Sequence, residues 1–272
     1  MIVLELFAGT RSIGKSFEKR GHKVFSVEWD KNFKDIDLYE DINNVSAKDI
    51  LKLCGGVPDV VWASPDCTTY SIAAISHHRK YEEGVLMPVS DYAKFCEKTN
   101  KHVLDLIEEL KPKYYFIENP RGGLRKMDFM KGLYRYTVTY CQYGDNRMKP
   151  TDIWTNHPNP QFKPMCKNGD KSHTSSPRGS HTGTQGLKNA KERSIIPEKL
   201  CEHIVDICEK GENMEDKILN ETTTFCNECP SKECCLENDC VLYRIEQIVL
   251  EKDNVPKIES SFEGQTTIED YI

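Results

Sequence analysis

Residues 2–14, "IVLELFAGTRSIG", indicate a buried strand, a glycine-containing turn and the start of a helix. The run at 2–6 is apolar apart from one glutamate, which is typical of a parallel strand covered on both faces. Gly9 and Gly14 would let the backbone of the turn pass close to a ligand. Their spacing lacks the G-x-G-x-x-G pattern that binds a pyrophosphate, so a dinucleotide is not predicted.

Similar short apolar runs recur at intervals that leave room for helices: 24–28, 59–63 and 114–118, with a further strand and turn over 135–144. Apolar residues at helical spacing predict a helix over 91–110, ended by Lys111-Pro112. Another amphipathic helix is expected over 195–210, with Pro197 in its first turn. This alternation predicts a doubly wound, Rossmann-like α/β sheet with right-handed crossovers.

Composition limits the class of protein. The chain has 272 residues, a net charge of -6 and twelve cysteines. No apolar run approaches the ~20 residues that span a bilayer, so no membrane partner is expected. The start lacks signal-peptide features, which favours a cytoplasmic protein with mostly reduced thiols. Residues 163–193 carry seven basic against two acidic residues, a local excess of five that suits phosphate contacts, although a solvated basic loop fits equally well.

The residues that follow each strand are the candidates for chemistry, because doubly wound sheets bind ligands beyond the carboxyl ends of their strands. Glu28 and Trp29 follow the second run, where a carboxylate holds ribose hydroxyls and an aromatic ring can stack on adenine. Cys67 follows the third run, and Glu118 and Asn119 end the fourth. An adenosine-containing ligand without a diphosphate, facing a thiol and a carboxyl group, is therefore predicted.

Taken in order, these residues resemble the DNA (cytosine-5) methyltransferase family from residue 1 to about residue 210. The cofactor side of the resemblance lies in three motifs: "ELFAGTRSIGKSF" (5–17), "VEWD" (27–30) and "EDI" (40–42). The catalytic side lies in four more: "SPDCTTYS" (64–71), "ENP" (118–120), "YGDNRMK" (143–149) where the family has Gln-x-Arg-x-Arg, and "RSIIPEKLCEHI" (193–204) as the closing helix region.

The resemblance implies transfer of a methyl group from S-adenosylmethionine to carbon 5 of a cytosine in DNA. Cys67 would add to carbon 6 of a flipped base, Glu118 would act as the acid at ring nitrogen 3, and Arg147 or Lys149 would position the base. The implied cofactor contacts are Phe7, Ala8, Gly9, Thr10, Glu28, Trp29, Asp41, Ile42 and Pro65. The implied substrate contacts are Ser64, Ser71, Asn119, Lys188 and Arg193.

Two residues depart from the family pattern: Asp66 replaces the small residue before the cysteine, and Thr68 replaces the glutamine after it. A carboxylate beside a thiol raises the pKa of that thiol. The same chemistry on tRNA, or a catalytically silent protein that binds S-adenosylmethionine and DNA, are therefore the alternatives. An exocyclic-amine methyltransferase ranks last, because it would need an aromatic ring where Cys67 stands.

The expected organisation has five parts: a cofactor-binding catalytic domain (1–154), a short target-recognition region (155–194), the closing helix (195–210), a Cys-rich appendage (211–253) and a flexible tail (254–272). So short a recognition region predicts a short or relaxed recognition sequence. A role in restriction-modification, in a bacterium or a virus-infected host cell, and a monomeric state are expected.

The appendage contains five cysteines between residues 226 and 240, which favours metal ligation over disulfides in a reducing compartment. The expected ligands are Cys226, Cys229, Cys235 and Cys240, with Cys234 competing with Cys235. Structural zinc is preferred to an iron–sulfur cluster, and free thiols are the alternative. The final "QTTIEDYI" resembles sliding-clamp peptides, against the simpler alternative of a disordered end.

Overall fold

The computed structural model describes residues 1–167, 169–174 and 190–211. The chain divides into two compact units, Met1–Glu209 and Lys210–Ile272, and nearly all of the second lies outside the described residues. Several predictions therefore concern residues outside that description: the appendage with Cys226, Cys229, Cys234, Cys235 and Cys240, the tail with its clamp peptide, and Lys188.

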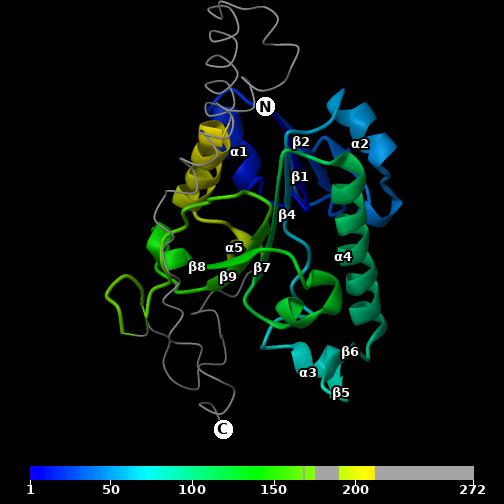
Figure 1. The fold of residues 1–272 in the computed structure, drawn as a ribbon, viewed down its shortest axis with the longest axis vertical. Coiled ribbons are helices and arrows are strands. Elements are labelled where there is room, and N and C mark those ends of the chain that lie inside the picture. Colours follow the sequence, from blue (N-terminus) through cyan, green and yellow to red (C-terminus); the bar gives the residue numbers. More distant parts are fainter. Residues whose placement is uncertain (168, 175–189, 212–272) are drawn as a thin grey trace, which may run out of the picture. The chain divides into compact units, whose positions relative to one another are not determined.

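A seven-stranded sheet forms the centre of the first unit, in the order β3-β2-β1-β4-β7-β9-β8 (Figure 1). Five neighbouring strands run parallel: β3 (Leu38–Tyr39), β2 (Lys23–Glu28), β1 (Ile2–Leu6), β4 (Val60–Ala63) and β7 (Tyr114–Pro120). At one end of the sheet, β9 (Pro150–Thr155) is antiparallel to both β7 and β8 (Arg135–Thr139). The predicted Rossmann-like α/β fold is confirmed, and the antiparallel β9 is an addition that the sequence patterns did not indicate.

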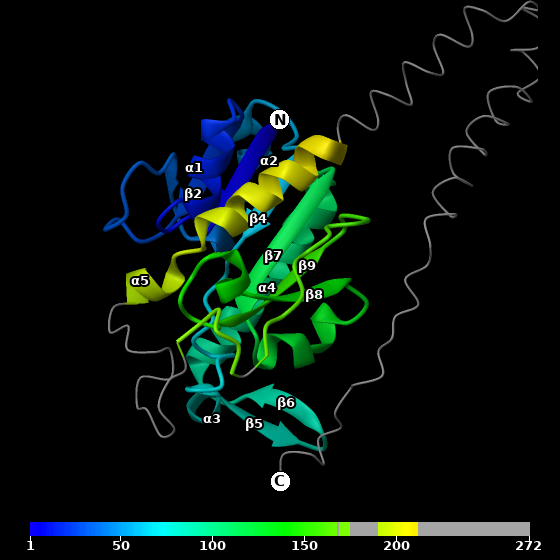
Figure 2. The same cartoon turned by 90° about the vertical axis from the view of Figure 1, so that its left-hand side faces the viewer.

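Helices cover both faces of this sheet and make three layers (Figures 1 and 2). One face packs against α1 (Ser12–Lys19) and the helix over residues 198–211, and the other against α2 (Ala47–Cys54) and α4 (Asp91–Leu110). Successive strand residues point to opposite faces, so Val3 packs in the apolar cluster on the α1 side and Leu4 in the cluster on the α2 and α4 side. The continuous apolar runs of the parallel strands follow from this double coverage.

Local chemistry sets the limits of the helices. The predicted helix over 91–110 is confirmed: Ser90 Oγ accepts a hydrogen bond from Ala93 N, and Lys111 adopts a left-handed conformation at the end. Pro197 precedes the helix over 198–211 rather than lying in its first turn, and its carbonyl accepts from the Leu200 and Cys201 amides. Proline lacks an N–H group, which is no loss at a helix start.

The strand and turn expected over 135–144 are confirmed. Strand β8 ends at Thr139, and a 3-10 turn, η4 (Tyr140–Tyr143), follows it. The hairpin of β5 (Arg79–Glu82) and β6 (Val85–Pro88) was not indicated by the sequence patterns. The remaining short elements are η1 (Ile42–Asn44), α3 (Ile75–His78), η2 (Gly123–Lys126), η3 (Asp128–Met130) and α5 (Ala190–Ser194). Among the described helices, none combines the length and apolarity needed to cross a membrane.

Candidate active site

The loops that follow β1, β2, β4 and β7 meet at one edge of the sheet, because parallel strands end on the same side. Ala63, the last residue of β4, is level with Ile117 of β7. Cys67 therefore follows β4 close to Glu118 on the neighbouring strand. The structure brings these two predicted residues to the same edge.

The loop over residues 64–71, which carries Cys67, is held by backbone and side-chain contacts from three other segments. Asn119 donates its side-chain amide to the Pro65 carbonyl at 2.9 Å. The Gly123 amide donates to the Tyr70 carbonyl at 2.7 Å. A Cβ atom at Gly122 would lie 2.4 Å from that same carbonyl oxygen, so only glycine allows this approach.

Arg79 supplies the third attachment of the loop. Its buried guanidinium donates through Nε to the Thr69 carbonyl at 3.1 Å and lies 4.2 Å from the centre of the Tyr70 ring. A further bond at 3.3 Å reaches Glu97 of α4. Such a set of contacts preorganises the loop, since a site is only as precise as the groups that support it.

Cys67 itself is half-buried, and its carbonyl accepts from the Ser71 amide at 2.8 Å. Burial raises the pKa of the Cys67 thiol to about 11, and the carboxylates of Asp66 and Glu118 add to the rise, whereas Lys149 opposes it. Asp66 is exposed, and its Oδ1 accepts from the Thr68 amide at 2.6 Å. The predicted influence of Asp66 on the thiol is thus present.

Glu118 is buried on β7, and its Oε1 accepts a hydrogen bond from the Tyr140 hydroxyl at 3.0 Å. The Lys149 ammonium lies 4.5 Å from the centre of the Tyr140 ring and donates to the Arg193 carbonyl at 3.0 Å. Burial lowers the pKa of Lys149, while Glu118 and the Cys67 thiol act in the opposite direction. Lys149 therefore shares one electrostatic environment with both expected catalytic groups.

Arg147, the other candidate for holding the base, forms an ion pair with Asp145. Its Nε lies 2.9 Å from both carboxylate oxygens, and the residue is buried. Its Nη1 is buried without a hydrogen-bond partner. An orphaned donor of this kind can serve a ligand acceptor, so Arg147 is a candidate for holding the base beside Lys149.

The turn after β1 is tightly folded, with positive φ angles at Phe7 (57°), Gly9 (49°) and Arg11 (56°). The Gly9 amide donates to Glu28 Oε2 at 2.9 Å, and the Trp29 and Asp30 amides donate to Glu28 Oε1 at 2.9 and 3.0 Å. A carboxylate offers about four acceptor positions, so one stays available for a ribose hydroxyl. The Trp29 side chain is 72% exposed, which leaves it available for stacking.

The other predicted cofactor contacts are mostly buried or form hydrogen bonds within the protein. Ala8, Ile42 and Pro65 are buried, and Thr10 Oγ1 lies 2.9 Å from Ser12 Oγ. Asp41, expected to reach the adenine amino group, accepts from the Asn43 amide at 2.9 Å and so caps η1. Of the predicted cofactor contacts, Glu28 and Trp29 thus keep an acceptor position and an exposed ring available for a ligand.

A buried side chain of the protein itself accounts for the glycine at position 14. A Cβ atom there would lie 2.5 Å from Glu5 Oε2. Glu5 is buried and accepts from the amides of Ile13 and Gly14, at the start of α1. Burial raises the pKa of Glu5 to about 8. Gly14 is thus required by a buried carboxyl group of the protein.

Two of the predicted substrate contacts, Asn119 and Ser64, form hydrogen bonds within the protein. Asn119 is fully buried; its side-chain amide donates to the Pro65 carbonyl, and its Oδ1 has no hydrogen-bond partner among the described residues, so its contact with a substrate stays a prediction. Ser64 Oγ accepts from Trp62 Nε1 at 2.7 Å. Ser71 and Arg193 are half-buried. Sequence patterns missed Tyr140 and Arg79, because each acts through a contact with a residue distant in sequence and neither belongs to a recognisable motif.

Residues 1–135 match the family model for C-5 cytosine-specific DNA methylase. A Frog virus 3 (isolate Goorha) protein named "Probable DNA (cytosine-5)-methyltransferase" is 26% identical over 224 residues, covering 76% of this chain and 100% of that protein.

Three solved structures also resemble the chain, each over 57% of its length. An E. coli prophage protein titled "putative DNA modification methyltransferase" has 16% identity and a TM-score of 0.42, with 46% of it covered. A Spodoptera frugiperda DNMT2 variant has 16% identity and a TM-score of 0.40, with 49% covered. S. pombe Dnmt2 has 13% identity and a TM-score of 0.38, with 48% covered. The chain spans about half the length of these solved proteins.

The doubly wound sheet brings Cys67 and the buried Glu118 to one edge, which is the arrangement that the sequence predicted for a methyltransferase. The match of residues 1–135 to the C-5 cytosine-specific DNA methylase model and the similarity to the viral relative both support this family. The family and the type of enzyme predicted from the sequence are confirmed.

Proposed function

We propose that this chain transfers a methyl group from S-adenosylmethionine to carbon 5 of a cytosine in DNA, through a covalent bond between Cys67 and carbon 6. The observation that carries the proposal is the common environment of Cys67, Glu118 and Lys149 at the carboxyl edge of the sheet. Carbon 5 of cytosine is too weak a nucleophile to take a sulfonium methyl without prior addition at carbon 6.

Each residue has a definite part in the proposed reaction. The Cys67 thiolate forms a bond to carbon 6, and its electron pair moves the ring electrons toward carbon 5. Glu118 holds ring nitrogen 3 and the exocyclic amine, with the Tyr140 hydroxyl fixing its carboxyl group. Lys149 or Arg147 holds the 2-keto oxygen. Carbon 5 would then take the methyl group, and the sulfonium would leave as a neutral thioether. Loss of the carbon 5 proton to a base restores the double bond between carbons 5 and 6 and expels the Cys67 thiolate.

S-adenosylmethionine supplies the electrophilic methyl group when bound. Glu28 would hold its ribose and Trp29 would stack on its adenine, beside the turn over residues 7–11. The target base has to leave the helix, because carbons 5 and 6 are shielded within a stacked duplex. The attached loop over residues 64–71 would keep the thiol in place while the base enters.

The DNA would lie along the basic stretch over residues 163–193. Lys163, Lys167 and Lys171 are exposed. At the other end of the stretch, the Lys191 ammonium lies 5.3 Å from the Phe33 ring, and the Arg193 carbonyl accepts from Lys149. The described residues at one end of the stretch thus offer candidate phosphate contacts, and Arg193 at the other end contacts the candidate base-binding lysine. Phosphate contacts of this kind give a binding constant that falls with salt.

A catalytically silent protein is the second candidate, favoured by the high pKa of the Cys67 thiol and the neighbouring Asp66. Enzymatic trapping separates the two. Random-sequence duplexes containing 5-fluorocytosine should form a denaturation-resistant adduct with the full chain in the presence of S-adenosylmethionine, because the fluorine blocks the final elimination.

The Cys67→Ser variant should form no adduct and methylate no DNA while keeping its affinity for S-adenosylmethionine. Cys54→Ala, at a buried cysteine on α2, serves as the matched control and should still form the adduct. Methylation by the serine variant would disprove the covalent route. An adduct with tRNA but not DNA would reassign the substrate, and cofactor and DNA binding without any adduct would identify a silent protein.

A further inference from the structure

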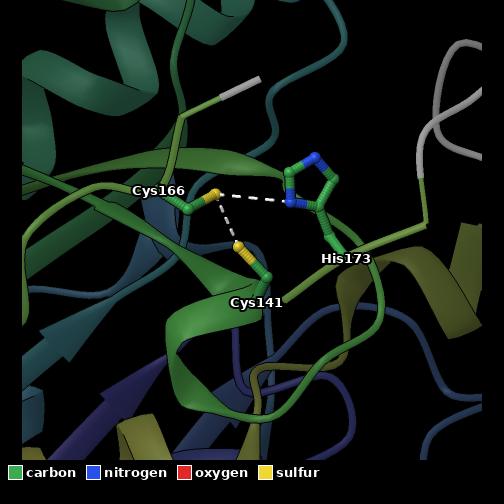
Figure 3. Close-up of side chains that lie close together, drawn as sticks. All are labelled: Cys141, Cys166 and His173. Atoms are coloured by element: carbon green, nitrogen blue, oxygen red, sulfur yellow. Dashed lines mark hydrogen bonds between the residues drawn. The ribbon is translucent and has the colours of Figure 1, made fainter. Parts of the chain in front are cut away.

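A group of soft ligand atoms lies outside the residues considered so far. Cys141 belongs to η4, directly after Tyr140, and Cys166 and His173 come from the segment that follows β9 (Figure 3). The two Sγ atoms are 2.7 Å apart, and Cys166 Sγ is 3.6 Å from His173 Nδ1. All three ligand atoms lie within 4.8 Å of one another.

We propose that Cys141, Cys166 and His173 bind a zinc ion. Thiolate and imidazole are the donors that zinc selects, and a tetrahedral site with bonds of about 2.3 Å to sulfur and about 2.0–2.1 Å to nitrogen needs an S···N separation near 3.6 Å. The distance of 3.6 Å between Cys166 Sγ and His173 Nδ1 equals this separation. The two sulfur atoms would move apart by about 1 Å to reach the corresponding S···S edge near 3.8 Å.

The surroundings of the group suit an ion with three protein ligands and one open position. Cys141 and Cys166 are 6% and 4% exposed, and His173 is half-buried, so water can reach the fourth position from the histidine side. The Cys166 amide donates to Thr139 Oγ1 at 3.0 Å, which fixes the backbone that carries this ligand. A disulfide between the two cysteines would explain their closeness but leaves the third donor without a purpose.

The ion would tie the basic stretch to the catalytic sheet. Its ligands join η4 to residues 166–173, and the Thr174 amide donates to the Asn146 carbonyl at 2.8 Å. Asn146 stands between Asp145 and Arg147, in the loop that also carries Lys149. Zinc binding would release protons from both thiols and hold this loop and the exposed Lys167 and Lys171 in one arrangement.

Metal analysis of the full chain, purified with and without added zinc under argon, tests the proposal. Cys166→Ser should contain one zinc per chain less than the wild type, and Cys54→Ala should lose none. A Cys226→Ser/Cys229→Ser variant should keep this ion, whatever the appendage binds. Equal zinc content in Cys166→Ser and the wild type would overturn the proposal, as would a wild type without zinc.

A measurement on the wild type guards against a variant that fails to fold. Peptide-resolved alkylation should leave Cys141 and Cys166 protected until a chelator is added, after which both react, while Cys54 changes little. A Cys141–Cys166 disulfide found in non-reduced peptides would replace the zinc site by a redox pair. Alkylation that does not respond to the chelator would also refute metal binding.

Discussion

Replacing Asp66 by asparagine should make Cys67 a better nucleophile. The Asp66 carboxylate raises the pKa of the Cys67 thiol, after burial as the larger cause. Because Asp66 is exposed, its charge acts through a high effective dielectric. Charges about 6 Å apart at a dielectric of roughly 40–80 interact by about 0.7–1.4 kcal/mol, or roughly 0.5–1 pKa unit.

The expected gain in rate is smaller than the gain in thiolate. Below pH 9 the thiolate fraction should rise about three- to tenfold, but a thiolate of lower pKa is intrinsically less nucleophilic, which leaves a net gain of about two- to threefold. Asparagine keeps the Oδ1 atom that accepts from the Thr68 amide, so the turn should survive the change.

Peptide-resolved alkylation of Cys67 against pH measures the effect without reference to methylation. Asp66→Asn should move the midpoint of the alkylation rate to lower pH, and single-turnover methylation should accelerate in parallel. Glu108→Gln, at an exposed position of α4, removes a charge of the same sign and should change neither rate. An unmoved midpoint in Asp66→Asn would refute the electrostatic argument.

Three further predictions concern stability and positioning. Burial raises the pKa of Glu5 to about 8, so the folded state keeps a proton that the unfolded state loses near pH 4.5. The free energy of unfolding should therefore fall as pH rises from about 5 to 8, and urea titrations of Glu5→Gln should show no such fall. Arg125→Met leaves the fully buried Asp152 carboxylate without its ion pair and should lower the free energy of unfolding by about 3–5 kcal/mol. The double variant Arg125→Met/Asp152→Leu should recover most of this loss, and a double variant in which the two single losses simply add would contradict the reasoning. Arg79→Met removes the donor to the Thr69 carbonyl and should lower single-turnover methylation more than cofactor affinity, as calorimetry of the same variant would check.

Local pattern was enough for the elements whose information lies within one stretch of chain. The apolar runs at 2–6 and 114–118 became β1 and β7, and helix 91–110 has the predicted limits, because periodicity and capping involve neighbouring residues. The position of Cys67 and Glu118 followed from a general property of parallel sheets rather than from any long-range contact.

The arrangement of side chains around these positions depended on contacts between distant segments. Asn119 bonds Pro65 from 54 residues away, and Lys149 meets the Arg193 carbonyl across 44. The Cys166 thiol meets Cys141 across 25 residues, and β9 lies between them in the chain. Such contacts form only when the sheet has assembled and the apolar clusters on its two faces have packed. The spacing of residues in the sequence does not indicate which backbone carbonyl or thiol will lie opposite a given side chain.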